Sequence, residues 1–291
     1  MAWLRKIAAA SHQISYAGTF IYHDGHRVET SRIWHVVDSK GEHERLATLD
    51  GPPREILRNN DDVTCYLPEK KVVLIEKRTA GRFPDLLPAQ LSNITDSYVP
   101  IKAEHDRVAG FNCQVILLKP KDNLRYGRYF CAELTTGLPL RVRTYNSDHE
   151  MIESFAFTEL DIGTAINRKM LQSHFASASR GWRIDRANQD DTPQSGEWSI
   201  NEPAGFKQLA AIKRSLPGHP VMSQLVYSDG IAAISVFIEP LSDSPPAVGP
   251  ASHGAINVYF KPQDDKMITV IGEAPPHTIK LIADSVTSEQ K

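Results

Sequence analysis

The sequence predicts an α+β protein of two domains, each built mainly on antiparallel strands. Short runs rich in aromatic and β-branched residues recur between residues 16 and 160, separated by Gly, Pro, Asn and Asp. The length of 291 residues favours more than one domain. Residues 186–197 are polar and poor in aliphatic side chains, which is typical of a linker. We therefore expect an antiparallel half-barrel or barrel over residues 1–185 and a smaller α+β domain with an antiparallel sheet over residues 198–291.

The first domain is predicted to begin with an amphipathic helix and to continue as a meander of strands. Trp3, Ile7 and Ile14 fall at helical spacing, so we expect a helix over residues 2–14 that packs on the sheet. Strand-like runs occupy residues 16–22, 28–37, 43–49, 54–58, 63–67, 71–77, 98–105, 111–118, 125–134, 140–145 and 151–160. Runs this short cannot bury an apolar face alone and must belong to one larger sheet. Apolar spacing predicts a closing helix over residues 162–178.

An apolar segment at residues 82–95 interrupts the strand pattern. It contains two prolines and a cluster of leucines, and it is predicted to form a short helix or a loop across one face of the sheet. Such a segment suits the mouth of a lipid-holding cavity, with Phe83, Leu86, Leu87 and Leu91 as ligand contacts. The same side chains can instead fill the core, and the sequence leaves both interpretations open.

The second domain is predicted to be a smaller sheet closed by a helix. Its strand-like runs lie at residues 206–214, 221–227, 231–238, 255–260 and 267–271. A hairpin turn is expected at residues 228–230, and the arm that follows it is apolar on both faces, as in a central strand. Residues 242–252 are rich in Pro and Ser and are expected to form a loop. Residues 275–286 carry an apolar stripe at helical spacing, with prolines at the start where a helix tolerates them.

Composition and motifs favour a binding protein over an enzyme. The net charge of −2 gives no general electrostatic reason to bind nucleic acid, and no apolar run of about 18 residues is present to span a membrane. The sequence contains no P-loop, no Gly-x-Ser-x-Gly elbow and no Gly-x-Gly-x-x-Gly motif. His23 and His26 flank a tight turn but lack a third ligand, so no metal site is expected. No cofactor is expected either.

Basic side chains on two consecutive strand runs offer a candidate site for an anion. The residues are Arg125, Arg128, Arg141 and Arg143. Arg141 and Arg143 are two positions apart and share a face of their strand, an arrangement that suits recognition of a carboxylate or phosphate. We interpret this pair as a candidate partner-binding site for an acidic peptide or a lipid phosphate. The alternative is a solvated, salt-bridged face neutralised by Glu133, Glu153 and Glu159.

The three cysteines allow one disulfide. Cys113 and Cys131 flank a plausible turn at residues 119–123. Folding there sets them opposite each other on neighbouring strands, close enough for a disulfide if the pair is of the non-hydrogen-bonded kind. Cys65 would then be left over. The alternative is three buried free thiols, the usual state in a reducing compartment. No Cys-x-x-Cys motif is present, so zinc ribbons and thioredoxin-like chemistry are not supported.

Two long segments resemble a known protein family. The first is GEHERLATLDGPPREILRNNDDVTCYLP at residues 41–68; the second is QLVYSDGIAAISVFIEPL at residues 224–241, followed by TVIGEAPP at residues 269–276. In the sequence and order of these segments, the chain resembles the RseB/MucB proteins, periplasmic regulators of envelope-stress sigma-factor signalling in Gram-negative bacteria. The matching segments cover both halves of the chain.

The resemblance implies a fold, a partner and a location. The fold would be an unclosed β-barrel wrapped on helices, similar to the periplasmic lipoprotein carriers. The function would be non-enzymatic: binding the periplasmic part of a transmembrane anti-sigma factor, shielding it from a site-one protease and releasing it when lipid or lipopolysaccharide fragments bind. The alternative functions are a periplasmic lipid or lipoprotein carrier and an enzyme of unknown chemistry.

The implied periplasmic location has consequences for the N-terminus and for the cysteines. No signal peptide is apparent at residues 1–6, so a periplasmic protein would be a mature form with an added Met1. Export also favours the disulfide between Cys113 and Cys131 over free thiols. Self-association into a homo-oligomer is left open.

Overall fold

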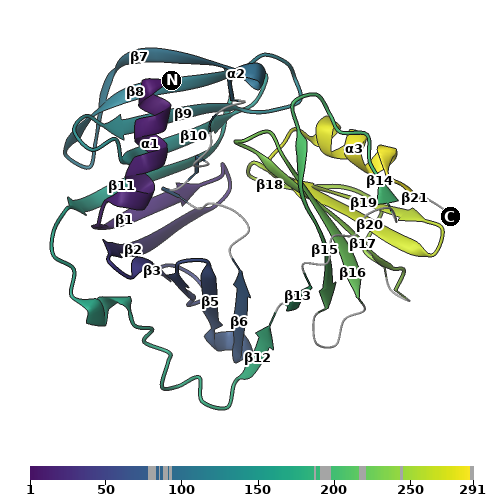
Figure 1. Cartoon of the computed structure of the whole chain (residues 1–291), viewed down its shortest axis with the longest axis horizontal. Coiled ribbons are helices and arrows are strands. Elements are labelled where there is room, and N and C mark those ends of the chain that lie inside the picture. The colour runs from purple at the N-terminus through teal and green to yellow at the C-terminus, as the bar shows by residue number, and fades with distance from the viewer. Residues whose placement is uncertain are drawn as a thin grey trace.

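The computed structural model of the chain contains two domains, each built around a β-sheet (Figure 1). It describes residues 1–77, 83–84, 86–87, 91, 94–186, 188–190, 198–215, 221–242 and 245–288. The protein is mostly β, with fewer helices than an α+β fold implies, and the predicted unclosed sheet of the first domain and antiparallel sheet of the second are confirmed. In the described ranges, the helical elements are α1 (Ala2–Gln13), α2 (Ile94–Ser97), α3 (Pro276–Ser285) and the 3₁₀ turns η1 (Pro68–Lys70) and η2 (Arg168–Leu171). The predicted helices at both ends of the chain are confirmed by α1 and α3.

The first domain is one twelve-stranded sheet that does not close on itself. Its strands are β1 (Tyr16–His23), β2 (Val28–Asp38), β3 (Gly41–Thr48), β4 (Glu55–Asn59), β5 (Asp62–Leu67), β6 (Val72–Lys77), β7 (Tyr98–Val108), β8 (Phe111–Pro120), β9 (Gly127–Glu133), β10 (Pro139–Tyr145), β11 (Met151–Ile162) and β12 (Arg183–Arg186). Their order is β12-β6-β5-β4-β3-β2-β1-β11-β10-β9-β8-β7, so β12 and β7 are the two edges. Neighbours are antiparallel except β12, which pairs with β6 in parallel. Figure 1 shows the sheet curled into an open trough.

The inner side of this sheet holds the main apolar core. Helix α1 packs there through Leu4 and Ile7, each with 1% of its surface exposed. Phe20 and Phe83 lie next to each other in the same core, with ring centroids 5.0 Å apart. Short strands with one apolar face thus share a single core, which none of them could build alone.

Charged and polar side chains meet in a partly buried cluster where the end of α1 meets the sheet. The Glu42 carboxylate lies 3.1 Å from His12 Nδ1, 3.4 Å from His35 Nε2 and 2.9 Å from Arg58 Nη2. Burial by itself raises the pKa of Glu42, but hydrogen bonds from His35 and Arg58 outweigh it and lower the pKa to about 2. Glu42 therefore stays ionised and ties β3 to α1, β2 and β4.

Cys113 on β8 and Cys131 on β9 form a disulfide, and both are fully buried. They are not directly opposite each other: Cys131 pairs with Val115, and Cys113 pairs with Glu133. The bridge therefore runs diagonally between positions two residues apart on one face of the sheet. Cys65 takes no part in this disulfide and is partly exposed.

The second domain is a seven-stranded antiparallel sheet covered on one face by α3. Its strands are β13 (Asn188–Asp190), β15 (Lys207–Ser215), β16 (Met222–Ser228), β17 (Ala233–Pro240), β18 (Gly249–His253), β19 (Ile256–Gln263) and β20 (Lys266–Gly272), in the order β13-β15-β16-β17-β20-β19-β18. The two short strands β14 (Trp198–Ser199) and β21 (Thr287–Ser288) pair separately. The loop predicted over residues 242–252 was wrong in part, because β18 pairs with β19 there. Ile279 and Ile282 of α3 are fully buried against the sheet.

The change from one sheet to the other falls between β12 and β13. Strand β12 belongs to the large sheet and β13 to the smaller one. Most of the predicted linker, residues 186–197, lies outside the described residues. The domain limits of 1–185 and 198–291 therefore stay a prediction.

The closing helix predicted over residues 162–178 was wrong. This stretch contains only the short 3₁₀ turn η2 and irregular backbone. Arg45 Nη1 donates to the Met170 carbonyl at 3.1 Å, and the His174 amide donates to Glu55 at 3.0 Å. Two backbone groups of this stretch are thus bonded to side chains of the sheet, while others form local turns.

Candidate functional site at the domain junction

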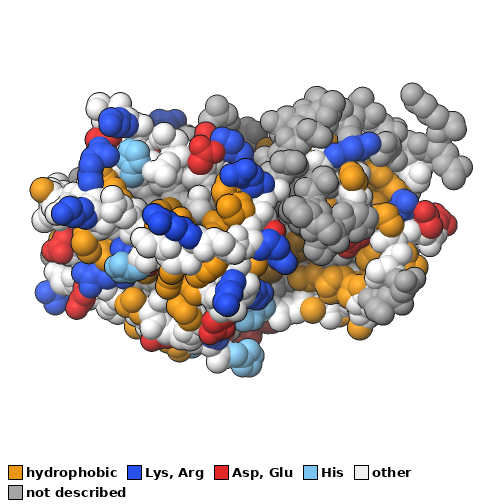
Figure 2. All heavy atoms as spheres, turned by 90° about the horizontal axis from the view of Figure 1, so that it is seen from below, with side chains coloured by type: hydrophobic (Ala, Val, Ile, Leu, Met, Phe, Trp, Pro, Cys, Tyr) orange, Lys and Arg blue, Asp and Glu red, His pale blue; other side chains and the backbone are white. Residues whose placement is uncertain are grey.

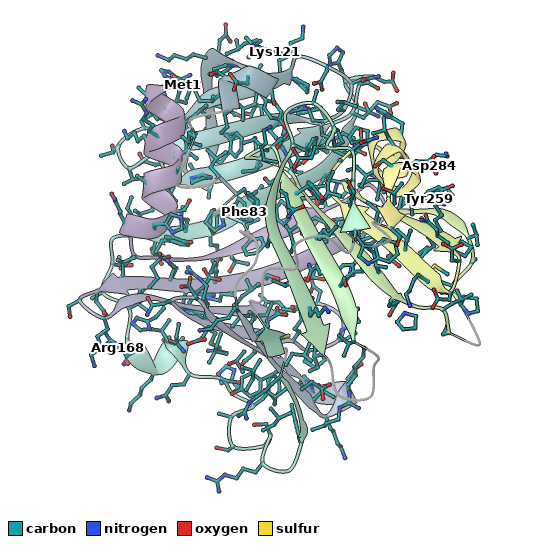
Figure 3. The ribbon with its side chains drawn as sticks, turned by 45° about the vertical axis from the view of Figure 1, so that its right-hand side comes forward. Met1, Phe83, Lys121, Arg168, Tyr259 and Asp284 are labelled. Carbon is teal, nitrogen blue, oxygen red and sulfur yellow. A yellow bond between two sulfur atoms is a disulfide. The ribbon has the colours of Figure 1, made fainter. Side chains whose placement is uncertain are left out.

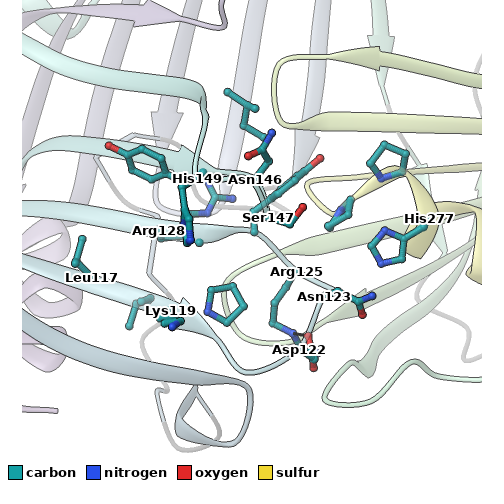
Figure 4. Close-up of a pocket in the computed structure, with 18 of the residues that line it drawn as sticks. Leu117, Lys119, Asp122, Asn123, Arg125, Arg128, Asn146, Ser147, His149 and His277 are labelled. Carbon is teal, nitrogen blue, oxygen red and sulfur yellow. Dashed lines mark hydrogen bonds and ion pairs between the residues drawn. The ribbon is translucent and has the colours of Figure 1, made fainter.

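A cavity of ≈ 730 Å³ opens where the two domains meet. Its walls come from β7 to β11 of the first domain and from the start of α3 in the second. Figure 4 shows Lys119 and His149 on the side of the first domain and His277 on the side of the second. Much of the lining is apolar, including Ile101 and Leu117. This volume falls within the range of about 300–1,000 Å³ that is typical of small-ligand sites.

A buried ion pair joins the domains beside this cavity. Arg125, which precedes β9, donates from Nη1 to Asp229 Oδ2 at 3.1 Å, and both side chains are fully buried. Asp229 lies in the turn between β16 and β17, and its other oxygen accepts the amides of Ile231 and Ala232 at 2.9 and 2.8 Å. Tyr98 of β7 donates to the same Oδ2 atom at 2.9 Å. All four contacts satisfy one carboxylate that would otherwise be costly to bury.

The Arg125 guanidinium is held from every side. Its Nε atom lies 3.0 Å from Asp122 Oδ1, and Nη2 donates to the carbonyl of Ala204 in the second domain. The ring centroids of Tyr98 and Phe206 lie 5.7 and 5.1 Å from its central carbon. Burial, and then the Asp229 charge, raises the pKa of Tyr98 well above its ordinary value. Tyr98 therefore remains a hydrogen-bond donor at any physiological pH.

A second charged group at the junction carries more negative than positive charge. Arg128 of β9 donates to Glu273, which follows β20 of the second domain. It also lies 3.7 Å from Glu153 of β11 and donates to Thr144 of β10. Burial raises the pKa of Glu153, Arg128 acts in the opposite direction, and Glu273 adds to the rise. Two carboxylates from different domains thus share one guanidinium.

The turn between β18 and β19 contacts the first domain closely. Gly254 has φ +58°, and a Cβ atom there would lie 2.8 Å from Tyr22 Oη and 2.9 Å from Asp24 Cβ. His253 Nε2 lies 3.1 Å from Asp24 Oδ2 across the same contact. Nearby, Asn257 donates to Tyr126 Oη at 2.9 Å. Backbone conformation and available space both favour glycine at this turn.

The chain that leads from the first domain to the second is clamped by the first domain itself. Arg45 and Glu55 form a buried ion pair at 2.7 Å on β3 and β4. As noted above, they also hold the backbone of residues 170–174. Trp34 covers the Arg45 guanidinium, with its ring centroid 4.7 Å away. The connection is therefore attached to the large sheet well before it reaches the second domain.

Comparison with known families identifies this two-domain arrangement. A family model described as the MucB/RseB N-terminal domain matches residues 1–175, and one described as the MucB/RseB C-terminal domain matches residues 192–287. The chain belongs to the MucB/RseB family. Members of this family are regulatory proteins and not enzymes.

Relatives and solved structures match the chain over nearly its whole length. The sigma factor AlgU regulatory protein MucB of Pseudomonas aeruginosa is 32% identical over 99% of this chain and 90% of its own. The sigma-E factor regulatory protein RseB of Escherichia coli K12 is 25% identical over 98% of this chain and 89% of its own. The crystal structure of MucB in complex with MucA(peri) matches at 30% identity with a TM-score of 0.76, covering 100% of this chain and 99% of that one. Another structure, described as the crystal structure of MucB, matches at 29% identity with a TM-score of 0.71, covering 99% of this chain and 97% of that one.

The segments that carry the MucB/RseB resemblance lie at these interdomain contacts. Arg45 and Glu55 belong to the first segment and hold the connection between the domains. Asp229 belongs to the second segment and Glu273 to the stretch at residues 269–276 that follows it, and each pairs with an arginine of the first domain. Sequence reasoning interpreted residues 228–230 only as a hairpin turn and missed Asp229 and Glu273. The family resemblance of these segments was the signal that could have pointed to both residues, because neither has an evident role in the local structure.

The predicted ligand contacts are part of the first core. Phe83, Leu87 and Leu91 expose 4%, 3% and 7% of their surface, and Leu86 packs against the same core. Figure 3 shows Phe83 on the inner side of the large sheet, away from Tyr259 and Asp284 of the second domain. Whether a ligand reaches these four residues stays a prediction.

The predicted partner-binding arginines differ in their environment. Arg141 Nη1 lies 2.9 Å from Asp106 Oδ2, so its charge is neutralised within the first domain. Arg143 stacks over Tyr129 at 5.2 Å, and its buried Nε atom has no hydrogen-bond partner among the described residues. A role of this pair in partner binding stays a prediction, and the structure leaves Arg143 the better placed of the two.

Other kinds of site find little support in the described ranges. No group of three or more His, Cys, Asp or Glu side chains there is placed to hold a metal ion. No described helix is both long and apolar enough to cross a bilayer. Figure 2 shows basic side chains interspersed with acidic ones on the face seen from below, and apolar side chains gathered on part of the second domain.

Proposed function

We propose that this protein is a periplasmic regulator that binds the periplasmic part of a transmembrane anti-sigma factor. The observation that carries the proposal is the match, over the entire chain, to MucB in complex with MucA(peri). Bound to the anti-sigma factor, the protein would shield it from regulated proteolysis. Lipid or lipopolysaccharide fragments would release it.

The domain junction supports such a switch because it can link two binding events. A ligand in the junction cavity contacts both domains, so its affinity depends on how they are arranged. A partner that also contacts both domains would depend on the same arrangement. Two ligands that favour different arrangements weaken each other's binding by the same factor.

The cavity has the chemistry for an acidic molecule with an apolar body. Ile101 and Leu117 supply apolar surface, while Lys119 and His277 stand on opposite sides of the opening (Figure 4). Neither Lys119 nor His277 has an ion pair among the described residues. Arg125 and Arg128 at the base of the cavity are already paired, so the first contacts of an acid group would be with Lys119 and His277.

The proposal is tested by protection of the partner from cleavage. The periplasmic segment of the host's anti-sigma factor is incubated with its site-one protease, with and without the chain. We expect the chain to slow cleavage, and lipopolysaccharide to restore the rate. An unchanged cleavage rate at a saturating concentration of the chain would refute the proposal.

The alternative is a periplasmic lipid or lipoprotein carrier. The open, curled sheet of the first domain favours it, because such a sheet has an apolar inner side. A carrier would bind lipid and leave the cleavage rate of the anti-sigma segment unchanged. The protection assay with a parallel lipid-binding measurement therefore separates the two functions.

A further inference from the structure

A buried arginine at the junction faces two carboxylates. Glu153 of the first domain exposes only 5% of its surface and lies 3.7 Å from Arg128, whereas Glu273 of the second domain, to which Arg128 donates, has 38% of its side chain exposed. One guanidinium can neutralise one carboxylate. With Arg128 paired to Glu273, the negative charge of the buried Glu153 is only partly neutralised, and an ionised group is costly to bury.

We propose that Glu153 makes the domain junction a proton-dependent latch, which holds the domains together more firmly when this carboxyl group is protonated. This goes beyond binding of an anti-sigma factor and does not depend on it. The latch is a property of the chain alone, so it can be tested without any partner.

The groups that face Glu153 come from both domains. They are Tyr22 of β1, Tyr126 before β9, Arg128 of β9, Thr144 of β10 and Glu273 after β20. Thr144 donates to Glu153 at 3.2 Å, and Tyr22 donates to it as well. Asp24 lies next to Tyr22 and is in turn faced by His26 and His253. Among all these groups, Glu273 and His253 alone belong to the second domain.

Part of the proton affinity of the Glu153 carboxyl group depends on the two domains being in contact. Burial, opposed by Arg128, raises the pKa of Glu153, and the nearby charge of Glu273 raises it further. When the domains separate, Glu273 moves away and water reaches Glu153, so this pKa falls toward its ordinary value. The closed arrangement therefore binds the proton more tightly than the open one. Falling pH favours the form that binds more protons, which is the closed one.

A second polar contact joins the domains near Glu153. His253 Nε2 lies 3.1 Å from Asp24 Oδ2. Burial alone raises the pKa of Asp24, but the amides of Arg27 and His26 outweigh it, so the pKa is lowered and the carboxylate persists. The Asp24 carboxylate therefore faces His253 of the second domain across the junction.

The latch can be tested by measuring the distance between the domains as a function of pH. Spin labels are placed at Glu104→Cys on β7 and Leu281→Cys on α3, both exposed positions, in a Cys65→Ser background. Pulsed electron paramagnetic resonance then gives the distance distribution between pH 5 and pH 8. We expect one narrow distribution at low pH and a broader one, extending to longer distances, at high pH.

Two variants and a control separate the latch from a structural effect. Glu153→Gln should give the narrow distribution at every pH, because the side chain is permanently neutral. Glu273→Gln should shift the midpoint of the pH-dependent change to lower pH. The variant removes the negative charge that raises the pKa of Glu153 and leaves Glu153 as the one carboxylate of the pair facing Arg128. Glu159→Gln, on the same strand but with 73% of its side chain exposed, should behave as the unmodified chain.

Two results would overturn the proposal. The first is a distribution in the unmodified chain that does not change between pH 5 and pH 8. The second is a Glu273→Gln variant with an unshifted midpoint, which remains informative even if Glu153→Gln fails to fold.

Discussion

Replacing Asp229 with asparagine tests how strongly the buried ion pair holds the junction together. Asp229 Oδ2 and Arg125 Nη1 lie 3.1 Å apart, and neither side chain is exposed. Asparagine keeps one side-chain oxygen that can accept the hydrogen bonds from the backbone amides of Ile231 and Ala232. The variant therefore removes mainly the charge. Breaking a buried pair from one side costs about 3–5 kcal/mol, because the other charge stays buried. We expect Asp229→Asn to lower the free energy of unfolding by this amount in urea titrations followed by circular dichroism.

A double-mutant cycle shows whether the loss belongs to the pair. Arg125→Met removes the other charge, and the double variant Arg125→Met/Asp229→Asn should lose less than the two single variants together. Groups in direct contact are coupled by about 0.5–3 kcal/mol. If the loss of the double variant equals the sum of the two single losses within about 0.5 kcal/mol, the reasoning is refuted. Asp284→Asn is the control: its carboxylate pairs with Lys280 on the surface of α3, and such a pair is worth less than about 1 kcal/mol.

Further predictions concern a turn, a buried carboxylate and the disulfide. Gly254→Ala should lower the free energy of unfolding by about 1–3 kcal/mol through backbone strain and close contacts. Gly51→Ala should lose less in the same urea titration, because its φ is also positive but no atom lies within 4 Å of the added Cβ. Glu42→Gln should cost on the order of 2–3 kcal/mol at pH 7, and less as pH falls from about 4.3 toward 2, because stability gained from a lowered pKa is lost on protonation. Equal costs at pH 7 and pH 3 would contradict this. Replacing Cys113 and Cys131 with serine should cost about 3 kcal/mol, since the bridge closes a loop of 18 residues, and a thermal melt of the oxidised and reduced chain checks this value.

Local chemistry made the strands of both domains predictable. Turn residues and alternating or β-branched runs marked where most strands begin and end, and the helices at both ends of the chain followed from apolar spacing. These signals act over a few residues, so they need no knowledge of the tertiary structure. The overestimate of helix came from residues 162–178. Apolar spacing there resembled a helix, but Arg45 and Glu55, more than a hundred residues earlier, captured the backbone.

The junction could not be predicted from the sequence because its contacts join distant residues. Arg125 and Asp229 are 104 residues apart, and Arg128 and Glu273 are 145 apart. Nothing local distinguishes Asp229 from an ordinary turn aspartate or Arg128 from an ordinary surface arginine. The disulfide was within reach of local reasoning because one turn separates its cysteines. Only the register of the strands, which placed the cysteines diagonally, required the structure.

Calorimetric titration of the purified chain with the periplasmic segment of its host's anti-sigma factor tests the central claim most directly. We predict saturable binding of one segment per chain that weakens progressively as lipopolysaccharide is added. Binding that does not change with lipopolysaccharide would contradict release by lipid. The absence of any binding heat, supported by a second method such as sedimentation, would contradict the proposed regulatory function itself.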